Sequence, residues 1–506
     1  MESWPQLGAF TRGDGVEFRV WAPGGREVAV RVRGRDHPLE PEGEGRFAGI
    51  VEAGEGDDYV FVLDGRALPD PCSRFQPQGV RGPSRVVDVA GDPILGVPLD
   101  ELVLYELHVG TFSPSGTFDG VADRLPELRE LGVTAIELMP VATFPGERNW
   151  GYDGVYAYAP HPAYGGPEGF ARLVAAAHAA GLGVVLDVVY NHIGPGSDAI
   201  AAFGPYFTDR HSTFWGDAID YSQRGVREWA IQNAEMWVRD YGVDGLRLDA
   251  THAIFDDSRP EILAELARRV KAIDERVLLV AEMETGDMRP IEQWGLDAQW
   301  ADELHHLVHV LLTGEDEGYY GDYRPSVSDL ARQLERAPAE RLVVCAQNHD
   351  QVGNRALGDR PATDELRIRA ATVLFAPQTP LLFMGEEYGE RRPFQFFTDH
   401  IDPEIAEATK EGRRREFSRF EAFSGEEVPD PQDPATFERS KLRPEGGDPE
   451  VRAFYARMLA LRRRLPRELS VDVDEEARTL RLCRGDVELR LDFARREVDL
   501  RSRGAT

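Results

Sequence analysis

The sequence predicts an α/β protein built on a (β/α)8 TIM barrel, with an N-terminal β-sandwich domain and a small C-terminal β domain. Three observations predict this fold. Short alternating strands occupy the first 95 residues, strands and amphipathic helices then alternate eight times, and short alternating strands return near the C-terminus. Strand–helix–strand units pair their strands in parallel, and eight such units favour a closed barrel over an open sheet.

The β-sandwich is expected over residues 1–95. Apolar and polar residues alternate at 15–21 and at 28–32, and residues 59–63 form a third apolar segment. Gly, Pro and Asp separate these segments and are typical turn residues. Short alternating strands between turns indicate a small sandwich.

The barrel is expected over residues 96–425. A strand at 102–107 is followed by a helix with Val121, Leu125, Leu128 and Leu131 on one face, which Gly132 should end. Apolar spacing of this kind is typical of an amphipathic helix. The remaining strands are expected at residues 135–139, 183–189, 243–249, 277–282, 296–300, 342–345 and 381–384.

Two segments depart from the strand–helix rhythm. Residues 192–224, inserted after the third strand, are long for a connection and rich in Gly, Pro and aromatic residues, and such connections are usually functional. Residues 426–506 should hold a linker rich in Pro, Asp, Glu and Gly, a helix near 450–465 and a β cap with strands near 479–482 and 487–491.

Composition limits the possible partners and locations. The 506 residues carry a formal net charge of −31, which argues against a nucleic-acid partner because phosphates need a basic surface. We expect no membrane span, because no apolar run reaches about 18 residues. The start lacks the pattern of a signal peptide, and Cys72, Cys345 and Cys483 are sparse and odd in number. A cytoplasmic location with reduced thiols is therefore expected.

Several carboxylates fall at the ends of predicted barrel strands. Asp187, Asp249 and Glu282 lie at or near the ends of three strands, and Asp350 follows the seventh within a few residues. These strand ends share one face of a barrel, where active sites lie. Carboxylates that lie close together raise each other's pKa, so a cluster of them at one face is unfavourable unless it serves a function. Glycoside hydrolysis supplies one, because it uses one protonated and one ionised carboxyl group.

Two local features bear on the roles of these acids. Arg247 precedes Asp249 by two residues and should share its face of the strand, which favours an ionised, nucleophilic Asp249. Glu282 follows the apolar run 277–281, which fits a desolvated acid with a raised pKa. These features favour Asp249 as nucleophile and Glu282 as acid, but leave the reverse assignment open.

Four segments resemble the signature regions of the α-amylase family of glycoside hydrolases, in the order of that family. They are residues 187–192, residues 245–249, the strand end at Glu282 and residues 348–350. The resemblance implies a retaining enzyme with Asp249 as nucleophile, Glu282 as general acid/base and Asp350 as the third carboxylate, which grips the sugar. It also implies that Arg247 orients Asp249, and that a sugar contacts Tyr152, Asp187, His192 and His349, with the Tyr152 ring stacked on it.

Further segments, at residues 301–306, 347–355, 396–400 and 429–434, resemble the subfamily that acts on maltooligosyltrehalose. Its members hydrolyse the α-1,4 bond next to the terminal trehalose, releasing trehalose and a maltooligosaccharide. The resemblance implies maltooligosyltrehalose synthase as the metabolic partner, and it makes residues 1–95 similar to a carbohydrate-binding module. Because later loops should read the trehalose end, candidate contacts are Asp302, Glu303, His306, Gln351 and Glu387.

Other interpretations stay open at several positions. Glycogen branching and debranching enzymes share the barrel and its chemistry, whereas the complete carboxylate set argues against a barrel that only binds glucan. His252 could contact substrate or be structural, and Glu386–Glu387 could be a solvated acidic pair. The His305, His306 and His309 spacing is better explained by sugar contact or helix packing than by a metal. We expect no cofactor and no metal, including calcium at Asn191.

Overall fold

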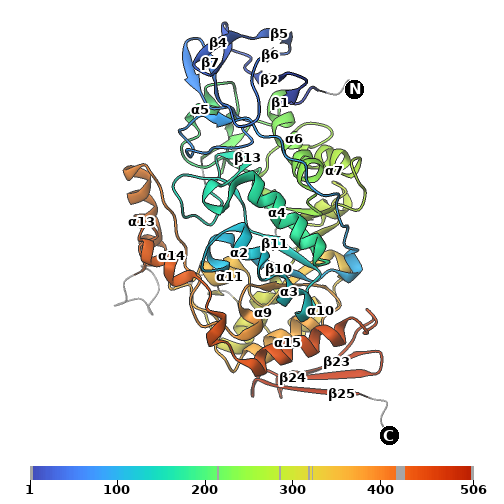
Figure 1. Ribbon diagram of the computed structural model, residues 1–506. Coiled ribbons are helices and arrows are strands. Elements are labelled where there is room, and N and C mark those ends of the chain that lie inside the picture. The colour runs from blue at the N-terminus through green and yellow to red at the C-terminus, as the bar shows by residue number, and fades with distance from the viewer. Residues whose placement is uncertain are drawn as a thin grey trace.

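The computed structural model describes residues 4–213, 216–283, 286–316, 320–321, 323–417 and 428–502. Figure 1 shows the N-terminal strands at one end of the molecule, the barrel in the middle and the C-terminal sheet at the opposite end.

The predicted barrel is confirmed: eight strands form a closed, parallel barrel in chain order. The first and last strands pair with each other, with Leu104 opposite Leu381. The strands are β10 (Leu104–Leu107), β11 (Ala135–Leu138), β14 (Gly183–Val188), β17 (Gly245–Leu248), β18 (Leu278–Ala281), β19 (Ala298–Trp300), β20 (Leu342–Cys345) and β21 (Thr379–Phe383).

Alternate side chains of these strands point into the barrel and fill it. The apolar residues of the interior form one buried cluster, which includes Leu104, Ala135, Val185, Val280, Val343 and Leu381. Further toward the carboxyl ends of the strands, the same faces carry Glu106, Asp187 and Arg247, all buried. The barrel interior is therefore apolar in one layer and polar in the next layer, which lies nearer the carboxyl ends of the strands.

The helices around the barrel follow the predicted rhythm with one difference. The single helix expected at 121–131 is two helices, α2 (Phe118–Ala122) and α3 (Leu125–Leu131). Pro126 explains the break, because proline lacks an N–H and is tolerated only in the first helical turn. Gly132 ends α3 as predicted, with φ of 117°.

The long segment after the third barrel strand has secondary structure of its own. It contains α5 (Asp198–Ala201) and an antiparallel hairpin of β15 (Phe207–Thr213) and β16 (Gly216–Ile219). Trp21 of the N-terminal domain packs edge-on against Tyr206 of this segment, with ring centroids 5.5 Å apart. The same indole covers Gly225, where a Cβ atom would lie 2.1 Å from the ring. The N-terminal domain thus supports the insertion beside the barrel.

The flanking regions are β-rich. The N-terminal region has two sheets: β1 (Gly8–Arg12), β2 (Gly15–Trp21), β6 (Arg46–Val51) and β5 (Glu40–Gly43) in one, and β4 (Arg35–Pro38), β3 (Val28–Val32), β7 (Asp58–Leu63) and β8 (Arg66–Leu68) in the other, with β9 (Ser84–Arg85) on β7. The C-terminal sheet is antiparallel, with the order β22 (Ser470–Asp474), β23 (Thr479–Arg484), β24 (Val487–Asp492) and β25 (Glu497–Ser502).

The segment between barrel and cap is partly helical. Its first residues, 426–427, lie outside the described part of the chain, and α14 (Pro434–Ser440) and α15 (Pro449–Arg462) follow. The domain boundaries near residues 95 and 425 remain predictions. Among the described helices, none has both the length and the apolar character needed to cross a membrane.

Candidate active site

A fully buried arginine lies at the centre of the polar layer. Arg247 Nη1 donates to Asp187 Oδ2 at 2.8 Å and to Asp249 Oδ1 at 2.7 Å, and Nη2 lies 2.9 Å from Glu282 Oε2. The guanidinium lies flat against Trp300, 4.2 Å from the ring centre. One arginine therefore holds three carboxylates that come from three neighbouring strands, β14, β17 and β18.

Asp249 accepts a hydrogen bond at each carboxylate oxygen. Arg247 donates to Oδ1, and the amide of Asn191 donates to Oδ2 at 2.6 Å. The side chain is 9% exposed, so part of it remains accessible to solvent. A fixed carboxylate with donors on both oxygens suits attack on an anomeric carbon.

Glu282 lies beside Asp249 and shares its arginine. Its Oε2 accepts from the backbone N–H of Ala250 at 2.8 Å, and the side chain is 21% exposed. Ala250 adopts the left-handed conformation, with φ of 39°, which is rare for a residue with a Cβ atom and typical of functional turns. Among the described residues, the contacts of the Glu282 carboxylate are with Arg247 and the N–H of Ala250, which are charged and polar rather than apolar. Arg247 contacts both acids, so it does not separate their roles.

Asp350 comes from α11 (His349–Gly353), which follows β20. Asn348 caps this helix by accepting from the N–H of Gln351 at 2.7 Å, and the Asp350 side chain is 33% exposed. Burial, together with the nearby carboxylates of Glu282 and Asp350, raises the pKa of Asp302 to about 7. Asp302 therefore joins these two acids in one cluster of negative charge.

The sugar-contact candidates surround this cluster. Tyr152 Oη donates to Asp187 Oδ2 at 2.7 Å and lies 2.8 Å from His349 Nε2, and the two rings are stacked with centroids 5.2 Å apart. His192 Nε2 lies 2.8 Å from the carbonyl oxygen of Tyr152. Burial raises the pKa of Asp187 to about 7, although Arg247 opposes the shift.

Four of the five candidate contacts for trehalose lie on two neighbouring helices, α9 (Glu303–Thr313), which Asp302 begins, and α11. His306 Nε2 lies 3.0 Å from Gln351 Nε2. Tyr320 donates to Gln351 Oε1 at 3.3 Å, and Tyr323 donates to Glu303 Oε2 at 2.9 Å. The structure thus gathers Asp302, Glu303, His306 and Gln351 along one side of the site.

The predicted contact between Glu387 and trehalose is not supported, because the structure places this side chain apart from the other four candidates. Its two carboxylate oxygens each lie 3.1 Å from the hydroxyl of Tyr105, and the residue is 1% exposed. The η6 turn (Glu386–Tyr388) lies between Gly385 and Gly389, both with positive φ, and all three of its residues are buried. Glu386 is equally buried, so a solvated acidic pair is also wrong.

The remaining histidines take different positions. His252 lies exposed on η3 (Thr251–Ala253), close in sequence to Asp249, which leaves both of its interpretations open. His305 Nδ1 lies 2.9 Å from the carbonyl oxygen of Ala346, and His309 Nε2 lies 2.7 Å from Glu315. Within the described ranges, no group of three or more His, Cys, Asp or Glu side chains could hold a metal ion.

Three residues that the sequence did not single out belong to the site. Trp300 supports Arg247, Ala250 binds Glu282 through its N–H, and Glu106 accepts from His349. Glu106 had a detectable signal, because it is a charged residue within an otherwise apolar barrel strand. Trp300 and Ala250 had none, since an indole or a small residue near a strand end is ordinary.

One family model and several known proteins are similar to this chain. The family model "Alpha amylase, catalytic domain" matches residues 83–206. The malto-oligosyltrehalose trehalohydrolase of Deinococcus radiodurans is 44% identical over 492 residues, covering 90% of this chain and 82% of that protein. The enzyme of the same name from Saccharolobus solfataricus is 41% identical, covering 89% and 85%.

A crystal structure described as a putative α-amylase from Salmonella typhimurium superposes with a TM-score of 0.87 and 37% identity, covering 97% of this chain and 94% of that one. A 1,4-α-glucan branching enzyme from Nitrobacter winogradskyi is more distant, at 30% identity over 75% of this chain and 62% of that protein. The chain therefore belongs to the malto-oligosyltrehalose trehalohydrolase family of glycoside hydrolases.

Proposed function

We propose that this protein hydrolyses the α-1,4-glucosidic bond next to the terminal trehalose of maltooligosyltrehalose, with retention of configuration. The observation that carries the proposal is the contact of one buried arginine, Arg247, with Asp187, Asp249 and Glu282 at the carboxyl ends of the barrel strands. Relatives that match about nine-tenths of this chain, at 44% and 41% identity, carry the name of this activity.

In the first step, Asp249 attacks the anomeric carbon of the sugar on the maltooligosyl side. Glu282 gives a proton to the glycosidic oxygen, and trehalose leaves. In the second step, Glu282 removes a proton from water, which displaces Asp249 from the glycosyl-enzyme. Retaining enzymes hold the two carboxyl groups about 5–5.5 Å apart, and contact with one shared guanidinium keeps Asp249 and Glu282 close.

Asp350 grips the sugar at the cleaved bond and stabilises the positive charge that develops there. A carboxylate placed near an oxocarbenium-like centre stabilises the transition state more than the ground state. Tyr152, His192 and His349 hold the hydroxyl groups of the same sugar. The ring of Tyr152 offers an apolar face of the kind on which pyranoses stack.

Recognition of trehalose is assigned to the polar side chains of Asp302, Glu303, His306 and Gln351. Trehalose is an α,α-1,1-linked pair of glucoses, so its hydroxyl pattern differs from that of maltose. A site whose buried donors and acceptors match one pattern rejects the other, because unmatched groups stay unpaired. Tyr320 and Tyr323, which hydrogen-bond Gln351 and Glu303, hold these side chains in place.

The substrate implies a supplier, and we assign that role to maltooligosyltrehalose synthase as the metabolic partner. A cytoplasmic location fits the free cysteines Cys72, Cys345 and Cys483, since disulfides are rare in that compartment.

The proposal is tested by chromatography of the products formed from maltotriosyltrehalose and from maltopentaose. Trehalose and maltotriose should form from the first substrate, and maltopentaose should be cleaved less efficiently. Formation of branched glucan would instead support a branching enzyme, and equal cleavage of both substrates would remove the assigned specificity while leaving the mechanism.

A further inference from the structure

Two buried glutamates lie side by side beneath the sugar-contact residues. Glu106 on β10 and Glu137 on β11 are register partners of adjacent parallel strands, and each is about 1% exposed. They share the inward face of Leu104 and Ala135, which belong to the apolar interior of the barrel. Two carboxyl groups at this depth cannot both be charged without cationic partners.

Glu106 pairs directly with such a partner, whereas Glu137 forms no ion pair with the residues that the structure describes. Glu106 Oε2 accepts from the backbone N–H of His349 at 2.9 Å, and Oε1 is paired with Nδ1 of the same ring. Neither oxygen of Glu137 has a hydrogen-bond partner in the described part of the chain. Burial, followed by the charge of Glu106, raises the pKa of Glu137 well above its usual range, so it stays protonated.

The other side of the His349 ring leads to the active site. Nε2 lies 2.8 Å from Tyr152 Oη, which itself lies 2.7 Å from Asp187 Oδ2, and Arg247 joins Asp187 to Asp249. The tyrosine has one proton, which it donates to the carboxylate of Asp187, so its oxygen accepts from His349 Nε2–H. Because Nδ1–H donates to Glu106, both ring nitrogens carry protons.

We propose that Glu106 is a positioning residue of the active site, which holds His349 as an imidazolium and so fixes Tyr152 and Asp187 for sugar binding. This role rests on the proposed reaction at Asp249 and Glu282. Glu106 touches no substrate and acts through His349. Glu137 fills space beside it as a neutral acid and takes no part.

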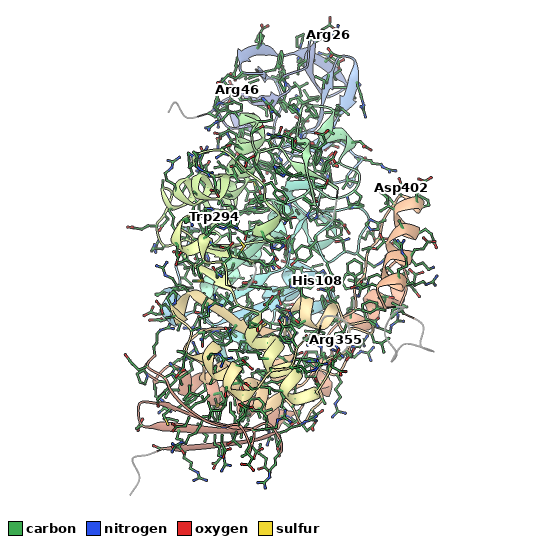
Figure 2. All side chains as sticks on the ribbon, turned by 180° about the vertical axis from the view of Figure 1, so that it is seen from behind. Arg26, Arg46, His108, Trp294, Arg355 and Asp402 are labelled. Atoms are coloured by element: carbon green, nitrogen blue, oxygen red, sulfur yellow. The ribbon has the colours of Figure 1, made fainter. Side chains whose placement is uncertain are left out.

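The surroundings of His349 support a charged ring. Burial lowers the pKa of His349, but Asp350 and Glu106 outweigh it and raise the value to about 10. His108 lies in the middle of the molecule (Figure 2), and burial, with the nearby charge of His349, lowers its pKa to about 4. The titratable and charged groups that face His349 are Glu106, His108, Glu137, Tyr152, Asp187, Arg247, Asp302 and, from its own helix, Asp350.

The test compares Glu106→Gln with Glu137→Gln, which make the same change on adjacent strands at the same depth. The charge of His349 is read from ring 15N chemical shifts of histidine-labelled protein titrated through neutral and alkaline pH, with the signal assigned through His349→Asn. The midpoint of this titration should be the same in the unmodified protein and in Glu137→Gln, and clearly lower in Glu106→Gln, where Asp350 alone still raises the pKa of His349. Loss of an adjacent carboxylate lowers a histidine pKa by roughly 1–3 units.

Turnover gives a second readout. Glu106→Gln should lower kcat by up to about 100-fold, as small misplacements of sugar contacts do. The alkaline limb of its pH–rate profile should move down by about one unit or more. Glu137→Gln should stay within about twofold at all pH values, because an amide replaces a neutral acid of the same shape.

Several outcomes decide the matter. An uncharged His349 ring at neutral pH in the unmodified protein, or matching effects of the two glutamine variants, overturns the proposal. If Glu106→Gln does not fold, the titration of the unmodified protein and of Glu106→Asp still decides, since the aspartate should keep the ring charged. The ring shifts need no turnover, so a charged His349 in a chain without trehalohydrolase activity would count against the proposed function alone.

Discussion

The guanidinium carbon of Arg247 lies 4.2 Å from the ring centre of Trp300, with both side chains buried in the barrel. Arg247 Nε has no hydrogen-bond partner within the described part of the chain, and the hydrogen bonds to Asp187 and Asp249 both leave from Nη1. The orientation of the plane that reaches three carboxylates therefore depends on the indole face. A desolvated cation–π contact of this kind contributes about 2 kcal/mol or more.

Replacing this ring should reduce catalysis beyond its effect on stability. Trp300→Leu should lower the free energy of unfolding by about 3 kcal/mol through the cavity it leaves, and kcat/KM by roughly 100-fold because Arg247 loses its support. Trp300→Phe keeps an aromatic face and should retain most activity. Steady-state kinetics and denaturant unfolding measure the two effects.

Trp294→Leu is the matched control, because this indole is also buried but donates to Glu261, which is not one of the carboxylates that Arg247 contacts. It should lose stability while the folded fraction keeps its kcat. A Trp300→Leu variant with undiminished kcat/KM would show that the indole does not hold Arg247.

The barrel could be predicted because its strands are apolar on both faces and alternate with helices, a pattern that few other folds give. The strand ends then placed Asp187, Asp249 and Glu282 on one face. The break between α2 and α3 was missed because the apolar spacing continues across Pro126, and periodicity does not register a missing N–H.

The candidate site was predicted less evenly. Glu387 was misplaced because its position after a strand does not reveal which way the following turn directs its side chain. Glu106 was overlooked because its importance lies in His349, a residue 243 positions away in the chain. Local sequence patterns indicate where strands end and which face of a helix is apolar. They do not indicate which residues from distant parts of the chain contact each other within the barrel.

The roles of the two catalytic acids differ in their response to the leaving group. Asp249→Asn should abolish turnover, because no neighbouring group can replace the attacking carboxylate. Glu282→Gln should be severe on the natural substrate and milder on a glucoside with an activated leaving group, which needs no proton. If Glu282→Gln lowers kcat equally on both substrates, Glu282 is not the general acid.

The stereochemical course follows from a covalent intermediate on Asp249. Two inversions at one carbon give net retention, so the new reducing end should appear first as the α anomer. Proton NMR within the first turnovers, before mutarotation, measures this. Early appearance of the β anomer would contradict a nucleophilic Asp249.

Activity should not depend on a bound metal. Asn191, the position that suggests calcium, uses its amide N–H to donate a hydrogen bond to Asp249. His309, a member of the histidine group that could suggest a metal, is paired with Glu315. Full kcat and an unchanged melting temperature are expected in excess EDTA. Activity lost to chelator and restored by Ca²⁺ or Zn²⁺ would contradict this prediction.

The preference for a trehalose end should depend on side chains that line one side of the site. Gln351 lies between His306 and Tyr320, and Glu303 accepts from Tyr323, so both are polar groups held in fixed orientations. Such groups discriminate most when the wrong ligand leaves them unpaired. The ratio of kcat/KM for maltotriosyltrehalose over that for maltopentaose should therefore be about 10-fold or more.

Gln351→Ala and Glu303→Ala should lower this ratio more than they slow cleavage of maltopentaose, because they remove contacts that only the trehalose end satisfies. Glu387→Gln is the control: its side chain is buried against Tyr105 outside the cleft, and an amide of the same shape still accepts from that hydroxyl. It should leave the ratio unchanged. A ratio that survives in Gln351→Ala and Glu303→Ala would mean that these side chains do not recognise the trehalose end.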